Sequence, residues 1–133
     1  MSVRVNQATA RELSNELRDI TSEAQMDTLA IITVTGARVA FFSKSKADAS
    51  EFAAIAASVI NSGGLAAKRL GMGDLSDVMV RCKNGFVILR AVGRFVLIGG
   101  SKNIKNFTRS AGVLVTHTEK LKQVLSNIPD EDW

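Results

Sequence analysis

Apolar residues recur every three or four positions in three stretches of the chain, and this spacing predicts three amphipathic helices. The first is expected to begin at Thr9, where Thr9 and Glu12 have the spacing of a capping box. The second is expected over residues 48–70 and the third over residues 104–128, with Pro129 ending it. Each predicted helix has one apolar face that must be covered.

Five short runs rich in β-branched and aromatic residues predict strands over residues 28–35, 38–43, 76–82, 86–92 and 95–99. The first run is apolar on both alternating faces, which is typical of a strand covered from both sides. Glycine-containing turns after the first and third runs indicate antiparallel hairpins.

The order of elements predicts an α+β fold with α/β/α layers. A five-stranded antiparallel sheet should carry the long central helix on one face and the N- and C-terminal helices on the other. Residues 9–128 are expected to form a single domain, with a flexible N-terminus at 1–8 and an acidic C-terminal tail at 129–133.

The central helix has two apolar faces of different character. Large side chains mark the one expected to face the core, including Phe52, Ile55 and Val59. Nearly all the residues on the other are small, so that a symmetry-related helix could approach this backbone closely: Ala53, Ala56, Ala57 and Ile60. The alternative is that alanine is present only because it favours helix.

The third predicted strand has the alternating pattern of a strand half exposed at the edge of a sheet. If two copies pair antiparallel about a two-fold axis at Met79, Asp77 of one lies opposite Arg81 of the other, which places opposite charges across the strands. The strand residues predicted to form a dimer interface are Asp77, Val78, Met79, Val80 and Arg81.

With 46% hydrophobic residues in 133, the chain can fill one core. The 17 basic and 13 acidic residues are interspersed, and the net charge of +4 indicates a mildly basic surface. A lone cysteine, Cys82, and the lack of an apolar segment of signal-peptide or membrane-spanning length predict a cytoplasmic protein with no membrane insertion.

Motifs for chemistry are missing. No phosphate-binding glycine loop occurs, and one histidine with one cysteine is too few for a metal centre, so no cofactor, metal site or catalytic residue is expected. His117, beside the apolar stripe of the last helix, is interpreted as a partly exposed polar residue rather than a catalytic base. Lys102, Lys105 and Arg109 form a modest basic patch, but aromatic residues are scarce, so no nucleic-acid partner is expected.

The order of elements, the Gly36 hairpin, the alanine-rich central helix and the glycines of 70–74 before the third strand together resemble the Roadblock/LC7 family, over about residues 13–125. The resemblance implies a profilin- or longin-like layered fold and a homodimer, heterodimer or higher oligomer, in which sheets join edge to edge. Bacterial and archaeal members commonly regulate small GTPases, and eukaryotic relatives serve dynein and lysosomal signalling scaffolds. A partner is therefore implied, and a reaction is not.

The function indicated is a non-catalytic homodimeric module that binds a Ras-like small GTPase through the central helix, at Ser50, Ala54, Asn61, Lys68 and Arg69. Regulation could use an inserted arginine, with Arg38, Arg69, Arg90 and Arg94 as candidates, or a complementary surface that holds the switch regions. The second mechanism is favoured. The rival functions are a profilin- or longin-like adaptor for cytoskeletal or trafficking proteins and a basic nucleic-acid accessory protein.

Overall fold

A computed structural model describes residues 3–44 and 48–129. Five antiparallel strands form one sheet in the order β2-β1-β5-β4-β3. The elements, in chain order, are α1 (Gln7–Ala24), β1 (Thr28–Thr33), β2 (Arg38–Ser43), α2 (Ala49–Arg69), β3 (Asp77–Cys82), β4 (Gly85–Val92), β5 (Phe95–Ser101), the 3-10 turn η1 (Ile104–Asn106) and α3 (Phe107–Leu125).

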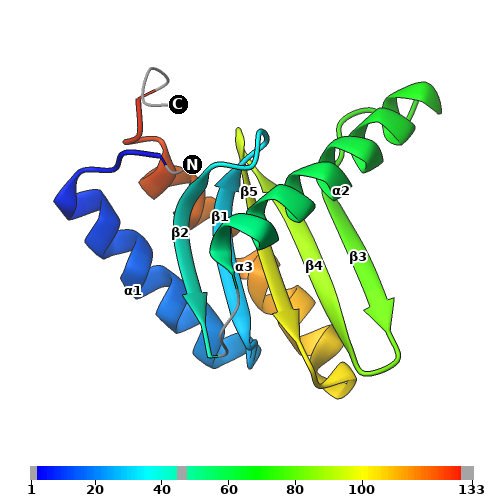
Figure 1. The fold of residues 1–133 in the computed structure, drawn as a ribbon, viewed down its shortest axis with the longest axis horizontal. Helices are drawn as coiled ribbons and strands as arrows, with labels where there is room; N and C mark the ends of the chain where they lie inside the picture. Colours follow the sequence, from blue (N-terminus) through cyan, green and yellow to red (C-terminus); the bar gives the residue numbers. More distant parts are fainter. Residues whose placement is uncertain (1–2, 45–47, 130–133) are drawn as a thin grey trace.

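The helices form layers on both sides of the sheet (Figure 1). Helices α1 and α3 cover one face, where their apolar residues form a core with strand residues such as Ile31, Ile88 and Leu97. Helix α2 crosses the other face and packs on alternate strand residues, including Ile32, Leu89 and Ile98. The α+β fold with a central helix on one face is confirmed.

The small face of α2 lies against the chain's own sheet. The side chains of Ala53, Ala56, Ala57 and Ile60 are buried there, whereas Ile55, predicted to face the core, is 57% exposed. The large residues of the strands already fill this layer, so small side chains are needed to let the helix backbone approach. The predicted contact of these four residues with a partner helix is therefore corrected.

Helix α1 begins earlier than the predicted capping box. The side chain of Asn6 accepts a hydrogen bond from the Thr9 backbone N–H at 2.8 Å, so Asn6 is the N-cap and Thr9 lies inside the helix. Val3 is buried, and its N–H donates to the carbonyl of Arg38 on β2. Residues 3–6 thus pack on the domain, in contrast to the flexible N-terminus expected for 1–8, of which residues 1–2 lie outside the described part.

The third predicted helix consists of two pieces, η1 and α3. The side chain of Asn103 accepts from the N–H of Lys105 at 3.1 Å and caps the short turn before α3 begins. After α3 the chain continues in turns to Ile128, which is buried in the α1–α3 core. The predicted acidic tail, apart from Pro129, lies outside the described residues.

Candidate interaction surfaces

Strand β3 is one edge of the sheet and, in the part of the chain that the structure describes, pairs only with β4. The N–H of Ala91 donates to the carbonyl of Ser76 at 2.9 Å, just before β3 begins. Because hydrogen-bonded and non-bonded pairs alternate in an antiparallel ladder, Val78 and Val80 direct their backbone groups to β4. Asp77, Met79 and Arg81 direct theirs outward, so the edge offers a row of unpaired donors and acceptors.

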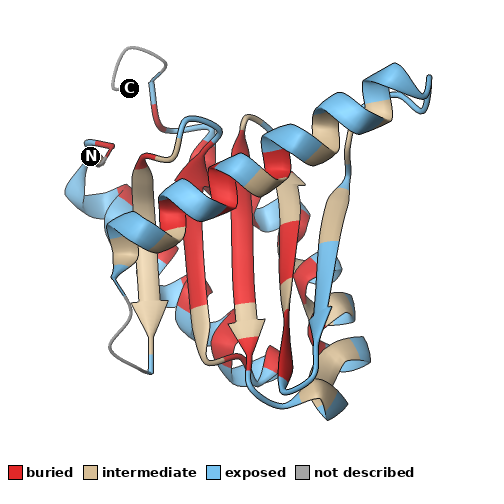
Figure 2. Cartoon of the chain, turned by 45° about the vertical axis from the view of Figure 1, so that its right-hand side comes forward, coloured by how far each residue is buried: buried red, intermediate tan, exposed pale blue. Residues whose placement is uncertain are grey.

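Apolar side chains flank this open edge on both faces of the sheet. Met79, on the α3 face, is 47% exposed, and Val80, on the α2 face, is 38% exposed. Most of β3 is exposed, while the strands at the centre of the sheet are buried (Figure 2). An edge with free backbone groups and exposed apolar side chains is a template for pairing with another strand.

Helix α2 extends past β3. It crosses the strand at Gly63, where an added Cβ would lie 3.2 Å from Val78 Cγ2 and 3.3 Å from a methyl of Leu75. Beyond that point the C-terminal end of the helix projects from the edge of the sheet (Figure 1). This projection and the loop after it expose large apolar side chains, namely Leu65, Leu70 and Met72.

The charged residues predicted to pair across a dimer have partners within the chain. Arg90 Nη1 donates to Asp77 Oδ2 at 2.9 Å, and Arg90 Nε donates to Thr118 Oγ1 at 2.8 Å. The guanidinium of Arg81 lies 5.3 Å from the centre of the Phe107 ring. Asp77 is thus tied through Arg90 to α3, while Arg81 remains exposed and close to the edge.

All the α2 residues predicted to bind a partner are exposed. Ser50, Ala54, Asn61 and Lys68 lie along one side of the helix, because their separations of four and seven residues correspond to whole turns, and Arg69 faces a neighbouring direction. Asn61 Nδ2 donates to the carbonyl of Val34 at 2.8 Å and fixes the β1–β2 turn beside the helix. The sequence-predicted stripe is thus brought together on one surface.

The four candidate arginines differ in availability. Arg90 is held by Asp77 and Thr118, and Arg94 lies over the ring of Phe95 and donates to the carbonyl of Ile128. Arg38 is half-buried in β2. Arg69, in the last turn of α2, is exposed, so it is the candidate best placed to reach another protein.

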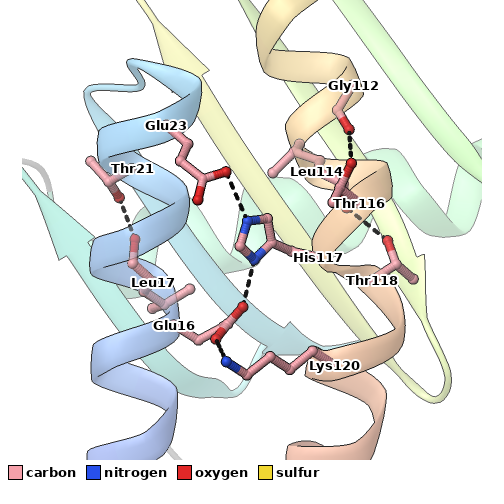
Figure 3. Close-up of polar contacts among 10 residues, drawn as sticks. All are labelled: Glu16, Leu17, Thr21, Glu23, Gly112, Leu114, Thr116, His117, Thr118 and Lys120. Carbon is pink, nitrogen blue, oxygen red and sulfur yellow. Dashed lines mark hydrogen bonds and ion pairs between the residues drawn. The ribbon is translucent and has the colours of Figure 1, made fainter.

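A polar cluster that the sequence did not indicate joins α1 to α3 (Figure 3). His117 Nδ1 lies 2.5 Å from Glu16 Oε1, His117 Nε2 lies 3.2 Å from Glu23 Oε2, and Lys120 Nζ lies 3.0 Å from Glu16 Oε2. Glu16 is only 3% exposed. Glu16 and Glu23 are separated by seven residues, and this spacing on one helix side was the only signal available.

The cluster shifts the pKa values of its members. Burial alone would lower the pKa of His117, but hydrogen bonds and negative charge from Glu16 and Glu23 outweigh it, and the pKa is raised above 6.5. Burial would likewise raise the pKa of Glu16, but its bonds to His117 and Lys120 lower it below 4.5. The charged forms of both groups are therefore favoured.

Within residues 3–44 and 48–129, no group of three or more His, Cys, Asp or Glu is arranged to hold a metal ion. None of the described helices combines the length and the apolar character needed to cross a bilayer.

Residues 13–99 match the model of the Roadblock/LC7 domain family. Among solved structures, the fold resembles Myxococcus xanthus MglB with a TM-score of 0.81 and 14% identity, covering 87% of this chain and 96% of that one. It also resembles the gliding protein MglB of Thermus thermophilus, with a TM-score of 0.75 and 16% identity over 98% and 97% of the two chains.

A more distant likeness is to profilin IB of Acanthamoeba castellanii, with a TM-score of 0.53 and 20% identity over 77% of this chain and 90% of profilin. Comparison with curated proteins gave no significant match. At these identities the solved structures establish the layered fold, and the profilin likeness confirms the predicted profilin-like architecture.

Proposed function

The chain belongs to the Roadblock/LC7 family, and from that premise we propose that it is a non-catalytic homodimeric module that binds and regulates a Ras-like small GTPase. The family match supports a regulatory binding role, since the resemblance implies GTPase regulation in bacterial and archaeal members. The observation that carries the dimer is the open β3 edge, with outward backbone groups and the exposed Met79 and Val80.

The direction of the free backbone groups favours one register for the two copies. If the two-fold axis passes through Met79, this residue and Met79 of the second copy form a hydrogen-bonded pair. Asp77 of each copy then pairs with Arg81 of the other, and all the outward groups of the strand are used. An axis at Val78 or Val80 would leave part of this row unpaired, so the Met79 register is the proposed one.

The projecting end of α2 supplies the apolar part of the same interface. In the joined sheet, the segment beyond Gly63 extends over the second copy, because it already overhangs the edge that would be shared (Figure 1). Leu70 and Met72 would lose their exposure there. Removing such apolar side chains from water favours association.

Dimerisation would also create the surface for the GTPase. A two-fold axis perpendicular to the sheet keeps the two α2 helices on the same face, so the stripes that contain Ser50, Ala54, Asn61 and Lys68 form one platform. The platform has few charged side chains, and the geometry suits a surface that holds mobile switch segments in one arrangement. Arg69 is the residue that could add positive charge near a nucleotide.

The test uses the purified chain and a Ras-like small GTPase from the same cell, loaded with GTP. Binding is measured by titration calorimetry and hydrolysis by single-turnover phosphate release, for the unaltered chain and for Ala54→Arg, which adds bulk to the exposed stripe. Gln123→Arg, on the exposed side of α3, is the matched control. The proposal expects binding that is lost in Ala54→Arg and kept in the control, with both variants still dimeric.

Two outcomes would contradict the proposal. Equal binding by all three proteins would show that the GTPase does not bind the α2 platform. If the chain bound no small GTPase of the host, a GTPase would be ruled out as its partner. A folded monomer that binds actin or a trafficking protein would instead favour the profilin-like adaptor, whose fold this chain shares.

A further inference from the structure

His117 lies between two carboxylates, one at each ring nitrogen. Glu16 faces Nδ1 at 2.5 Å and Glu23 faces Nε2 at 3.2 Å (Figure 3). A neutral imidazole carries a proton on one nitrogen and a lone pair on the other, so one of the two carboxylates would face a lone pair. The imidazolium donates from both nitrogens and satisfies the whole arrangement.

We propose that the His117–Glu16–Glu23 cluster is a proton-operated clasp, which fastens α3 to α1 when His117 is protonated and loosens when the proton is lost. The three side chains come from two helices that are far apart in the sequence, and the clasp lies beside the apolar core that these helices share. Its closure therefore fixes how α3 sits on the sheet.

Burial makes the proton decisive for Glu16. This carboxylate is 3% exposed, and its other partner, Lys120, is 67% exposed on a flexible stem. A charge that is removed from water is costly unless it is paired, and an exposed lysine is screened by solvent. When His117 is neutral, Glu16 loses its buried counter-charge.

Other charged groups surround the clasp without contacting the imidazole. On α1, the negative charges of Glu12 and Asp19 act on Lys120 and help to keep it protonated. On α3, Arg109 Nε donates to the carbonyl of Glu23 at 2.8 Å and ties the end of α1 to the start of α3. None of these groups is placed at a ring nitrogen of His117, so the proton on His117 controls the cluster.

The sign of the pH dependence follows from the two shifts. The pKa of His117 is raised, so its stabilisation is complete below pH 6.5 and is lost as the pH rises through the folded pKa. The pKa of Glu16 is lowered, so its stabilisation is complete above pH 4.5 and is lost in acid. The clasp thus stabilises the fold most between pH 4.5 and pH 6.5, and it opens as the pH rises above the folded pKa of His117.

The chain has a single histidine, which makes the test direct. The ring of His117 is titrated by NMR in the unaltered chain, in Glu16→Gln, in Glu23→Gln and in the control Glu119→Gln, which removes an exposed carboxylate of α3. If the clasp exists, the pKa of His117 is above 6.5 in the unaltered chain. It is lower in both clasp variants, with the larger decrease in Glu16→Gln, and is unchanged in the control. A pKa at or below 6.5, or one that neither variant changes, would overturn the proposal.

A second measurement reads the interface itself. Amide hydrogen exchange of α3, corrected for the intrinsic effect of pH, is compared between the unaltered chain and His117→Gln from about pH 6 to about pH 9, a range that spans the raised pKa. Protection of α3 should fall severalfold with pH in the unaltered chain and stay flat in the variant; parallel curves would contradict the clasp. Because none of the clasp residues belongs to β3, the same test can be repeated in a variant with a blocked edge, so failure of the clasp is separate from failure of the dimer.

Discussion

The two edge strands of the sheet, β2 and β3, are built in opposite ways. Every residue of β2 is half-buried, α1 packs beside it, and the N–H of Val3 donates to the carbonyl of Arg38. The register between β1 and β2 also shifts between Ile31 and Ile32. Strand β3 has a continuous register with β4, and its last four residues are exposed.

The difference indicates which edge is available to another chain. A covering segment and an irregular register are means by which proteins keep an edge strand from pairing with other strands. Strand β2 has both, and β3 has neither within the described residues. The exposed Met79 and Val80 lie on the unprotected side, where the proposed dimer would cover them.

The largest effect is expected from lysines at the open edge. Met79→Lys combined with Val80→Lys would place unpaired charges in the proposed interface of both copies. The dissociation constant should rise at least a thousandfold, which corresponds to about 4 kcal/mol. Sedimentation equilibrium checks this, with Val115→Lys, an exposed apolar position on α3, as control. If the double variant dimerises as well as the control, β3 is not the interface.

Next in size is the contrast between two glycines beside the edge strands, Gly85 at the start of β4 and Gly36 in the turn before β2. At Gly85, which follows β3, φ is +155° and an added Cβ would overlap the Ser101 carbonyl oxygen, so Gly85→Ala should cost about 3 kcal/mol of unfolding free energy. At Gly36, before β2, φ is +92° and the nearest atom is at 3.5 Å, so Gly36→Ala should cost about 1 to 2 kcal/mol. Urea unfolding of both variants decides the order, and the reverse order would refute it.

A smaller loss of unfolding free energy is expected when the N-terminal segment that contains Val3 no longer covers the edge of β2. Val3→Asp places a carboxylate in a buried apolar position, which should cost about 2 kcal/mol and free the edge of β2. Arg4→Asp, at the exposed neighbouring position, is the control. Light scattering should show association beyond the dimer in the Val3 variant alone. If no such association is seen, α1 and the irregular register are enough to keep the edge of β2 from pairing, and the segment around Val3 is not needed.

The smallest effect concerns the register of the proposed dimer. Arg81→Glu would face Asp77 of the second copy and replace attraction by repulsion, for about 1 kcal/mol or a severalfold weaker dimer. Lys83→Glu makes the same change in charge in the turn after β3 and should have no such effect. Equal weakening by both variants would show that only net charge matters and that the Met79 register is wrong.

The sequence predicted the order of elements correctly because each element has a strong local signal. Periodicity separates helices from strands, and Asp48 begins α2 as predicted, accepting from the N–H of Ser50 at 2.9 Å. The end of β5 was placed too early, at Gly99, whereas the strand continues to Ser101. The missing side chain of Gly99 makes room for Met26, whose Sδ would lie 2.5 Å from an added Cβ.

The faces of α2 could not be assigned from the sequence. Periodicity shows that two faces are apolar, but the choice between them depends on the size of the side chains that the strands place below the helix. Ile32 and Ile98 fill that layer, so Ala53 and Ala56 fit against it and Ile55 is left exposed. The burial of Glu16 could not be predicted for a similar reason, because it depends on His117, which lies 101 residues later on another helix.

Amide hydrogen exchange of β3 tests the dimer most directly. In a single chain the N–H groups of Asp77, Met79 and Arg81 point to solvent, while those of Val78 and Val80 bond to β4. The proposed dimer predicts slow exchange at all five amides when the mass is twice 14.3 kDa, and fast exchange at the first three alone after dilution to the monomer. Fast exchange at those three in a sample that is dimeric by mass would contradict pairing through this edge.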